Sequence, residues 1–309
     1  MQRYSYPGHE ESSMNKTNDL FRPAEYFKPT TIKEAVELLL RYGEKGKLIA
    51  GGSDLLIAKD PQIEALIDIT GLGLNYIKSD SQGLRIGAAT VFADIETSLE
   101  LSTGPYHIIA RAAHEIGTPQ IRNLGTIGGN ICNAVPSADS APVLLVLDAT
   151  LNISGPSGEK PMDITDFFKD VRKNALGEGE LLTEIRVPVF PAHTGTAFIK
   201  KGRVAAADLS VVNVAVRLTM TPDNTCQDVR IALGAVAPTP LRAKEAEAML
   251  RGKKPQEMLL ERVAARAAEE IQPISDVRSS AEFRRTLSRV LVGRALNEGT
   301  AEAFTQQLN

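Results

Sequence analysis

The amino-acid sequence predicts an α+β protein built from two domains. The chain has 309 residues, of which 43% are hydrophobic, so it can bury a sizeable core and is long for a single domain. Its opening has a β-α-β-like pattern, and its last third places three strand candidates before three helical stretches. We therefore expect a larger domain over residues 21–190 and a smaller α+β domain over residues 191–309. The polar residues 1–20 lack periodicity and are expected to form a flexible arm.

The larger domain is predicted to begin with a helix and two buried strands. Thr31 and Glu34 have capping-box spacing, apolar residues follow them, and Gly43 can end the helix. The short apolar runs 47–50 and 63–69 are typical of buried strands. The elements expected next are a strand over 84–88, two helices with Pro105 in a first turn and Gly117 at an end, a long loop over 119–136, a helix over 141–147, and strands over 150–154 and 181–187.

The smaller domain is predicted from a change of pattern after Pro191. Three runs there favour strands, and three later stretches favour helices. The strands are expected over 196–201, 209–219 and 229–236, and the helices are expected to begin near Leu241, Gln256 and Ser280.

Composition excludes several classes of function. The net charge is −3, and basic residues are scattered among acidic ones, so the basic stripe that nucleic-acid binding needs is missing. No apolar run approaches the roughly 20 residues that span a bilayer, and the first 20 residues lack a signal-peptide core, so we expect a cytoplasmic protein without membrane partners. Cys132 and Cys226 alone cannot ligate an iron–sulfur cluster.

Two glycine-rich segments, 48–55 and 123–130, carry the strongest sign of chemistry, and both are predicted to lie on strands or loops. Adjacent glycines let backbone N–H groups approach an anion such as a pyrophosphate, because no Cβ intervenes. A single segment of this kind is more often a plain tight turn than a binding loop. Together they predict a clamp for one dinucleotide. Side chains that add donors, or acceptors for ribose or ribityl hydroxyls, are Ser53, Asp54, Thr126, Asn130 and Asp139.

These segments resemble the two flavin motifs in the medium subunit of the xanthine dehydrogenase and carbon monoxide dehydrogenase family. The first match runs from Ala50 to Leu56 and the second from Gln120 to Asn130. The resemblance continues in order through most of the chain from Phe21. Other matching segments are 27–29, 84–90, 136–139, 184–188 and 208–216.

The resemblance implies a vanillyl-alcohol-oxidase-type (PCMH-like) domain over 21–190, with FAD between lobes of about 21–77 and 78–190, followed by the C-terminal domain. It also implies a role for single residues. Asp139 matches a contact to the polar chain of the flavin, while Leu182 and Lys200 match positions near the flavin ring. Ile116 stands where some members pack an aromatic side chain on that ring. The implied FAD-binding residues are Ile49, Ala50, Gly51, Gly52, Ser53, Asp54, Leu55, Ile116, Thr126, Gly128, Gly129, Asn130, Asp139, Leu182 and Lys200.

The resemblance further implies an electron-relay subunit with no catalytic residue and no metal ligand of its own. Its partners would be a small subunit with [2Fe–2S] clusters and a large subunit with a molybdopterin-type molybdenum cofactor, in a dimer of heterotrimers, with NAD among the acceptors. Arg122 and Asn123 would order the second glycine segment, touch FAD or meet the small subunit. Two alternatives stay open: a self-sufficient flavin reductase of the same fold, and a non-catalytic FAD-binding assembly module.

Overall fold

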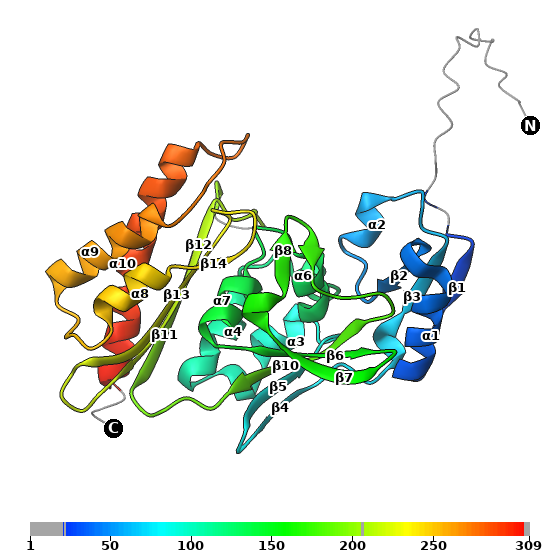
Figure 1. Cartoon of the computed structure of the whole chain (residues 1–309), viewed down its shortest axis with the longest axis horizontal. Helices are drawn as coiled ribbons and strands as arrows, with labels where there is room; N and C mark the ends of the chain where they lie inside the picture. Colours follow the sequence, from blue (N-terminus) through cyan, green and yellow to red (C-terminus); the bar gives the residue numbers. More distant parts are fainter. Residues whose placement is uncertain (1–20, 22, 205–206, 306–309) are drawn as a thin grey trace, which may run out of the picture.

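Three larger β-sheets and their helices succeed one another along the long axis of the molecule (Figure 1). The computed structural model describes residues 21, 23–204 and 207–305. The predicted arm over 1–20 lies outside the described residues. The N-terminal sheet and the C-terminal helices occupy opposite ends of the view in Figure 1, with the second sheet and its helices between them.

The first sheet has three parallel strands in the order β1-β3-β2. Its strands are β1 (Glu25–Phe27), β2 (Gly46–Ile49) and β3 (Ala65–Asp68), and its helices are α1 (Ile32–Tyr42) and α2 (Leu55–Ala58). The predicted cap of the first helix is confirmed, because the Thr31 hydroxyl accepts a hydrogen bond from the amide of Glu34. Ala35 and Val36 of this helix pack with Ile67 of the sheet.

The second sheet is antiparallel and has the order β4-β5-β10-β6-β7. Its strands are β4 (Ile77–Asp80), β5 (Gly83–Gly87), β6 (Thr150–Gly155), β7 (Gly158–Asp163) and β10 (Leu181–Pro188). The helices are α3 (Phe92–Thr97), α4 (His107–His114), α5 (Pro119–Arg122), α6 (Ile127–Asn133) and α7 (Ser140–Val146), and β8 (Phe168–Asp170) pairs with β9 (Lys173–Asn174). Short 3₁₀ turns cover Gly43–Lys45, Ile69–Gly71, Leu99–Leu101, Gly104–Tyr106 and Ile164–Asp166.

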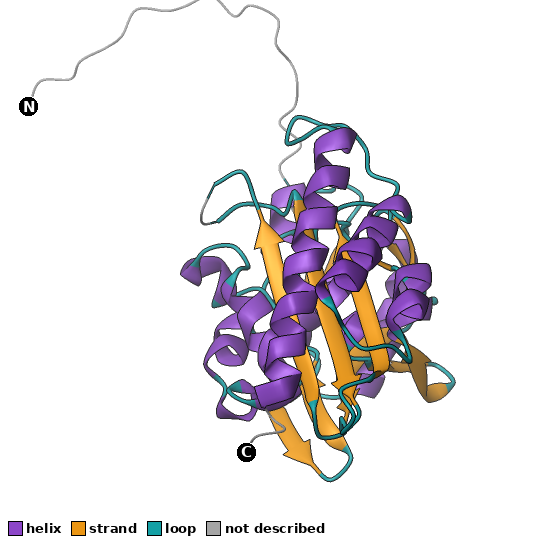
Figure 2. Ribbon diagram, turned by 90° about the vertical axis from the view of Figure 1, so that its left-hand side faces the viewer, coloured by secondary structure: helices purple, strands orange, loops and turns teal. Residues whose placement is uncertain are grey.

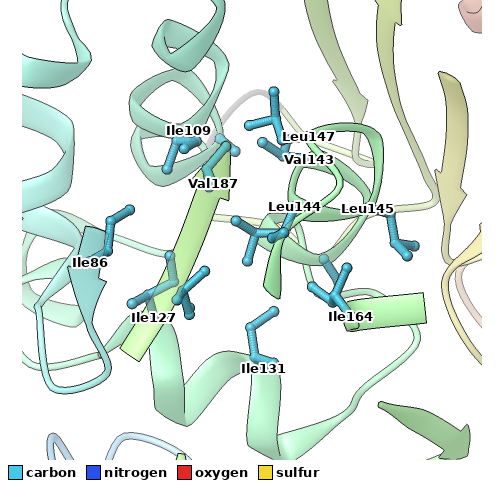
Figure 3. Close-up of a cluster of buried hydrophobic side chains, with 14 of the residues drawn as sticks. Ile86, Ile109, Ile127, Ile131, Val143, Leu144, Leu145, Leu147, Ile164 and Val187 are labelled. Carbon is cyan, nitrogen blue, oxygen red and sulfur yellow. The ribbon is translucent and has the colours of Figure 1, made fainter. Parts of the chain in front are cut away.

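The largest core cluster lies between the second sheet and its helices (Figure 3). Ile131 of α6 and Leu144 of α7 are fully buried there, together with Ile86 of β5. Fully burying an aliphatic side chain of this size contributes about 1.5–3 kcal/mol. This core fixes α6, and with it the second glycine segment, on the sheet.

The third sheet is antiparallel, with the order β11-β12-β13-β14, and helices cover one of its faces (Figure 2). Its elements are β11 (Thr194–Lys201), β12 (Val212–Met220), β13 (Cys226–Gly234), β14 (Leu241–Arg242), α8 (Lys244–Leu250), α9 (Glu257–Glu269) and α10 (Ala281–Thr305). Every residue of β12 is buried, since α10 packs against this strand and so does α7 of the preceding core. No helix in the described ranges is long and apolar enough to cross a membrane.

Two predictions about these elements were wrong. The expected long loop over 119–136 contains α5 and α6, because Thr118 and Thr126 each cap a helix with their hydroxyl groups. The first of the three C-terminal helices begins at Lys244 and not near Leu241, since residues 241–242 pair with β13 as a short strand. The remaining predicted helices and strands are present within a few residues of their expected bounds. The lobe and domain boundaries near 77 and 190 stay predictions.

Candidate functional site

A cleft of about 560 Å³ is lined by residues of the first sheet on one side and by residues of the second sheet's layer on the other. Its volume lies within the roughly 300–1,000 Å³ of small-molecule and cofactor sites. Both glycine segments line it. The predicted residues in its walls are Ile49, Ala50, Gly51, Gly52, Ser53, Asp54, Leu55, Ile116, Thr126, Gly128, Gly129, Asn130 and Leu182.

The first glycine segment offers unused backbone donors to the cleft. The amides of residues 51–54 donate no hydrogen bond within the described part of the chain. Gly52 has φ +66°, a left-handed conformation that favours glycine. Successive free N–H groups in such a turn form a concave anion site. This segment therefore fits the pyrophosphate of a dinucleotide, as the sequence predicts.

The second glycine segment uses its amides differently. The amides of Ile127 and Gly128 donate to the carbonyls of Thr90 (3.0 Å) and Ala88 (2.9 Å). Gly129 donates to the Thr126 hydroxyl at 3.1 Å, and Asn130 donates to the carbonyl of Thr126 at 3.0 Å. These bonds begin helix α6 and attach it to the end of β5. The segment consequently forms a wall of the cleft rather than a second set of free amides.

Glycine is required where the two segments approach other backbone. A Cβ on Gly51 would lie 1.6 Å from the carbonyl oxygen of Leu124, so the two segments are in direct contact. A Cβ on Gly128 would lie 2.5 Å from the carbonyl oxygen of Ala88. Neither position has room for a side chain unless the backbone moves.

Apolar side chains also line the cleft. Among them are Ile116, Ile121, Leu182 and Phe92, and Phe92 is 2% exposed. Cys132 also lines the cleft, and burial raises the pKa of its thiol to about 12. A thiol with that pKa stays protonated at neutral pH and acts as a small apolar surface.

The structure places Asp139 and Lys200 outside the residues that line the cleft. They pair with each other, the Lys200 Nζ lying 2.7 Å from Asp139 Oδ2, and both side chains are less than one-tenth exposed. The other Asp139 oxygen accepts from Ser210 at 2.5 Å and from Asn213 at 2.7 Å. Lys200 also donates to the carbonyl of Glu115 at 2.7 Å. These contacts link β11 and β12 to α7 and to the turn after α4.

Sequence reasoning missed the residues that the β8–β9 hairpin and the segment after it bring to the cleft. Arg172 lines the cleft and donates to the side chain of Asn133 at 3.1 Å, and Asn174 donates to the Cys132 carbonyl at 2.7 Å. Glu180 lines it too, but its carboxylate accepts from Lys160 at 2.5 Å and from the amide of Gly177 at 2.8 Å. The hairpin strands are two or three residues long, too short to leave a periodic signal.

Neither histidine of α4 lies in a metal site. Over the described ranges, no group of three or more His, Cys, Asp and Glu side chains is arranged to hold a metal ion. His107 Nδ1 lies 2.9 Å from the carbonyl of Gly104, and His114 Nδ1 lies 2.6 Å from a carboxylate oxygen of Glu96. Both rings are therefore engaged in local contacts.

Comparisons with known proteins agree with this geometry. A family model described as the FAD binding domain in molybdopterin dehydrogenase matches residues 20–190, and one described as the CO dehydrogenase flavoprotein C-terminal domain matches residues 197–299. The glyceraldehyde dehydrogenase medium chain of Sulfolobus acidocaldarius is 34% identical over 277 residues, which cover 88% of this chain and 97% of the relative. The xanthine dehydrogenase FAD-binding subunit of Escherichia coli is 33% identical over 294 residues, covering 92% and 98%. A solved structure of carbon monoxide dehydrogenase from Hydrogenophaga pseudoflava matches with a TM-score of 0.87 and 35% identity, covering 91% of this chain and 98% of that one.

Proposed function

The chain belongs to the family of FAD-binding medium subunits of xanthine and carbon monoxide dehydrogenases, and from this premise we propose that it relays electrons through an FAD held in the cleft. It is thus an oxidoreductase subunit with the predicted flavoprotein fold and C-terminal domain. The relay takes electrons from [2Fe–2S] clusters of a small partner subunit and passes them to an external acceptor. The flavin supplies the ability to accept electrons singly and release them in pairs.

The free amides of residues 51–54 are the observation that carries this proposal. They are the donors suited to the FAD pyrophosphate, and Ser53 adds a hydroxyl beside them. Gly128 lets α6 pack closely against the end of β5, while Ile116 and Leu182 give the cleft apolar lining that excludes water from the flavin ring. Asp54 is an acceptor for sugar hydroxyls at the rim. The proposal assigns this chain no catalytic acid or base and no metal ligand.

Asp139 and Lys200 keep a place in the proposal next to the cleft. Lys200, paired with Asp139, donates to the carbonyl of Glu115, the residue before Ile116, so the pair supports the turn beside which we propose that the flavin ring lies. A direct contact of either side chain with FAD would require the pair to rearrange, since Asp139 also accepts from Ser210 and Asn213.

The proposed assembly follows the relatives. Carbon monoxide dehydrogenase and glyceraldehyde dehydrogenase are named as having medium chains, which implies further subunits in those enzymes. For this chain we propose a small [2Fe–2S] subunit and a large subunit with a molybdopterin-type molybdenum cofactor, in a cytoplasmic dimer of heterotrimers. NAD is one proposed acceptor. We propose that the large subunit binds the substrate. The relatives are named as dehydrogenases of glyceraldehyde, xanthine and carbon monoxide.

The test is an anaerobic absorbance titration of the natively purified complex, with flavin, iron and molybdenum contents measured beforehand. Candidate purine, heteroaromatic and aldehyde substrates are added in turn. Bleaching of the flavin by one of them, in a complex that contains molybdenum and [2Fe–2S] clusters, supports the relay. Flavin reduced in the isolated chain by a dedicated substrate would instead indicate a self-sufficient reductase. A chain that associates with its partners without any flavin would indicate an assembly module.

A further inference from the structure

Two neighbouring segments bring isoleucine side chains to the lining of the cleft. Ile116 lies in the turn after α4, Ile121 lies in α5, and both line the cleft. Between them, Gly117 has φ +52°, and a Cβ at that position would lie 2.8 Å from Cγ2 of Ile121. The two isoleucines therefore belong to one tightly folded turn, and whatever fixes this turn fixes both side chains.

Arg122 at the end of α5 ties this turn to α4. Its side chain is 11% exposed, low for an arginine. Its Nη1 donates to the carbonyl of His114 at 3.0 Å and to the carbonyl of Ile116 at 3.2 Å. The last carbonyls of a helix have no partner within the helix, and a nearby cationic side chain can satisfy them. Arg122 thus caps α4 from the neighbouring helix.

Glu96 of α3 holds Arg122 in place. Its Oε2 lies 2.6 Å from Nε of Arg122, an ion pair in which the N–H group is not aligned for a hydrogen bond. Its Oε1 lies 2.6 Å from Nδ1 of His114. Burial alone would raise the pKa of Glu96, but the hydrogen bond with His114 and the charge of Arg122 hold that pKa below its usual value. The ionised glutamate offsets the charge of the guanidinium, so Arg122 acts on the cleft by position more than by its electric field.

We propose that Arg122, held by Glu96, is a positioning residue that fixes Ile116 and Ile121 against the flavin ring. This inference rests on the proposed function, because it requires FAD in the cleft. Isoleucine holds a ring only through dispersion contacts, and a gap of 0.5–1 Å already loses roughly a quarter to a half of such a contact. The packing around a flavin is one of the protein's means of setting its potential.

Removal of Arg122 should loosen the turn without unfolding the protein. Lys200 donates to the carbonyl of Glu115, so a second cation holds the same turn from β11. In the described part of the chain, no hydrogen bond joins the amides of residues 51–54 to Arg122 or to the turn that it holds. We therefore expect an Arg122 variant that still binds FAD but packs its ring differently.

The experiment compares Arg122→Ala and Arg122→Lys with Arg284→Ala in the natively purified complex. Arg284 is a matched control, because it is 2% exposed, donates to the carbonyls of Val211 and Ala235, and pairs with Asp276. It does not line the cleft. The measurements are FAD content, the visible circular dichroism of the flavin, its reduction against a reference dye, and the thermal midpoint.

Arg122→Ala is expected to keep FAD, to alter the flavin dichroism, and to change the ratio of reduced to oxidised flavin measured at a fixed dye potential. Arg122→Lys should restore part of both signals, because an ammonium can still bind Glu96 and one carbonyl. Arg284→Ala should lower the thermal midpoint and leave both flavin signals unchanged. Flavin signals of Arg122→Ala that match wild type, or that Arg284→Ala alters equally, would overturn the inference. Absence of FAD from the wild-type complex would instead refute the proposed function.

Discussion

Gly51→Ala is the sharpest test of the cleft, because it places one methyl group between the two glycine segments. The new Cβ would lie 1.6 Å from the carbonyl oxygen of Leu124, whereas ordinary contact begins at 3.4 Å, so the segments must separate by 1.8 Å, the difference of these values. A shift of that size breaks at least one hydrogen bond from the free amides to a phosphate. Hydrogen bonds to charged groups contribute about 1.5–3 kcal/mol. The Kd for FAD should therefore rise roughly 10- to 150-fold.

The assay is a titration of flavin-free protein with FAD, followed by flavin fluorescence at 25 °C, with thermal unfolding measured on the same samples. Gly293→Ala in helix α10 is the control, since a Cβ there would lie an ordinary 3.7 Å from Cβ of Ala264 in α9. Alanine is the better helix former, so the control should bind FAD normally and be equally or slightly more stable. If folded Gly51→Ala protein bound FAD within twofold of wild type, the two segments would not jointly form the site.

Three further predictions concern the elements around the cleft. Thr126→Ala removes the hydroxyl that accepts from the amide of Gly129 and should lower the free energy of unfolding by about 1 kcal/mol, measured by thermal unfolding. Thr126→Ser should restore most of this free energy, and an unchanged thermal midpoint of Thr126→Ala would contradict the capping role. Asp139→Ala leaves Lys200 buried without its ion partner and should lower the free energy of urea unfolding by about 3–5 kcal/mol. The double variant that also carries Lys200→Met should lose less of this free energy, because no buried charge is left unpaired. An Asp139→Ala variant as stable as wild type would contradict this role of the pair. The pKa of Glu184 is lowered, because hydrogen bonds, first that from Tyr76, outweigh the opposing effect of burial. The ionised carboxylate of Glu184 therefore contributes stability above the ordinary carboxyl pKa of 4.5, and this contribution is lost as pH falls through the lower folded-state pKa. Wild type should lose stability in acid more steeply than Glu184→Gln. Parallel curves of unfolding free energy against pH for the two proteins would contradict the assignment.

The sequence by itself determined the fold class, the family and the two glycine segments that line the cleft. Its clearest signals were local. Thr31 and Glu34 predicted the cap of α1, apolar runs predicted the buried strands, and the two glycine segments predicted a paired loop site. These features depend on neighbours in the chain, on turn chemistry and on hydrophobic periodicity, all of which can be seen without tertiary contacts.

The tertiary structure alone decided which polar groups remain free in that site. In the sequence both glycine segments offer amides, but the second one donates its amides to Ala88, Thr90 and Thr126, leaving residues 51–54 as the free donors. Asp139 looked available, yet Lys200 occupies it from 61 residues away. Arg122 gains its contacts with Glu96 and with the carbonyl of His114 only because α3 and α4 pack beside it. A backbone or side-chain group has a fixed capacity for hydrogen bonds, and whether a distant part of the chain uses that capacity is decided by packing, which local sequence does not encode.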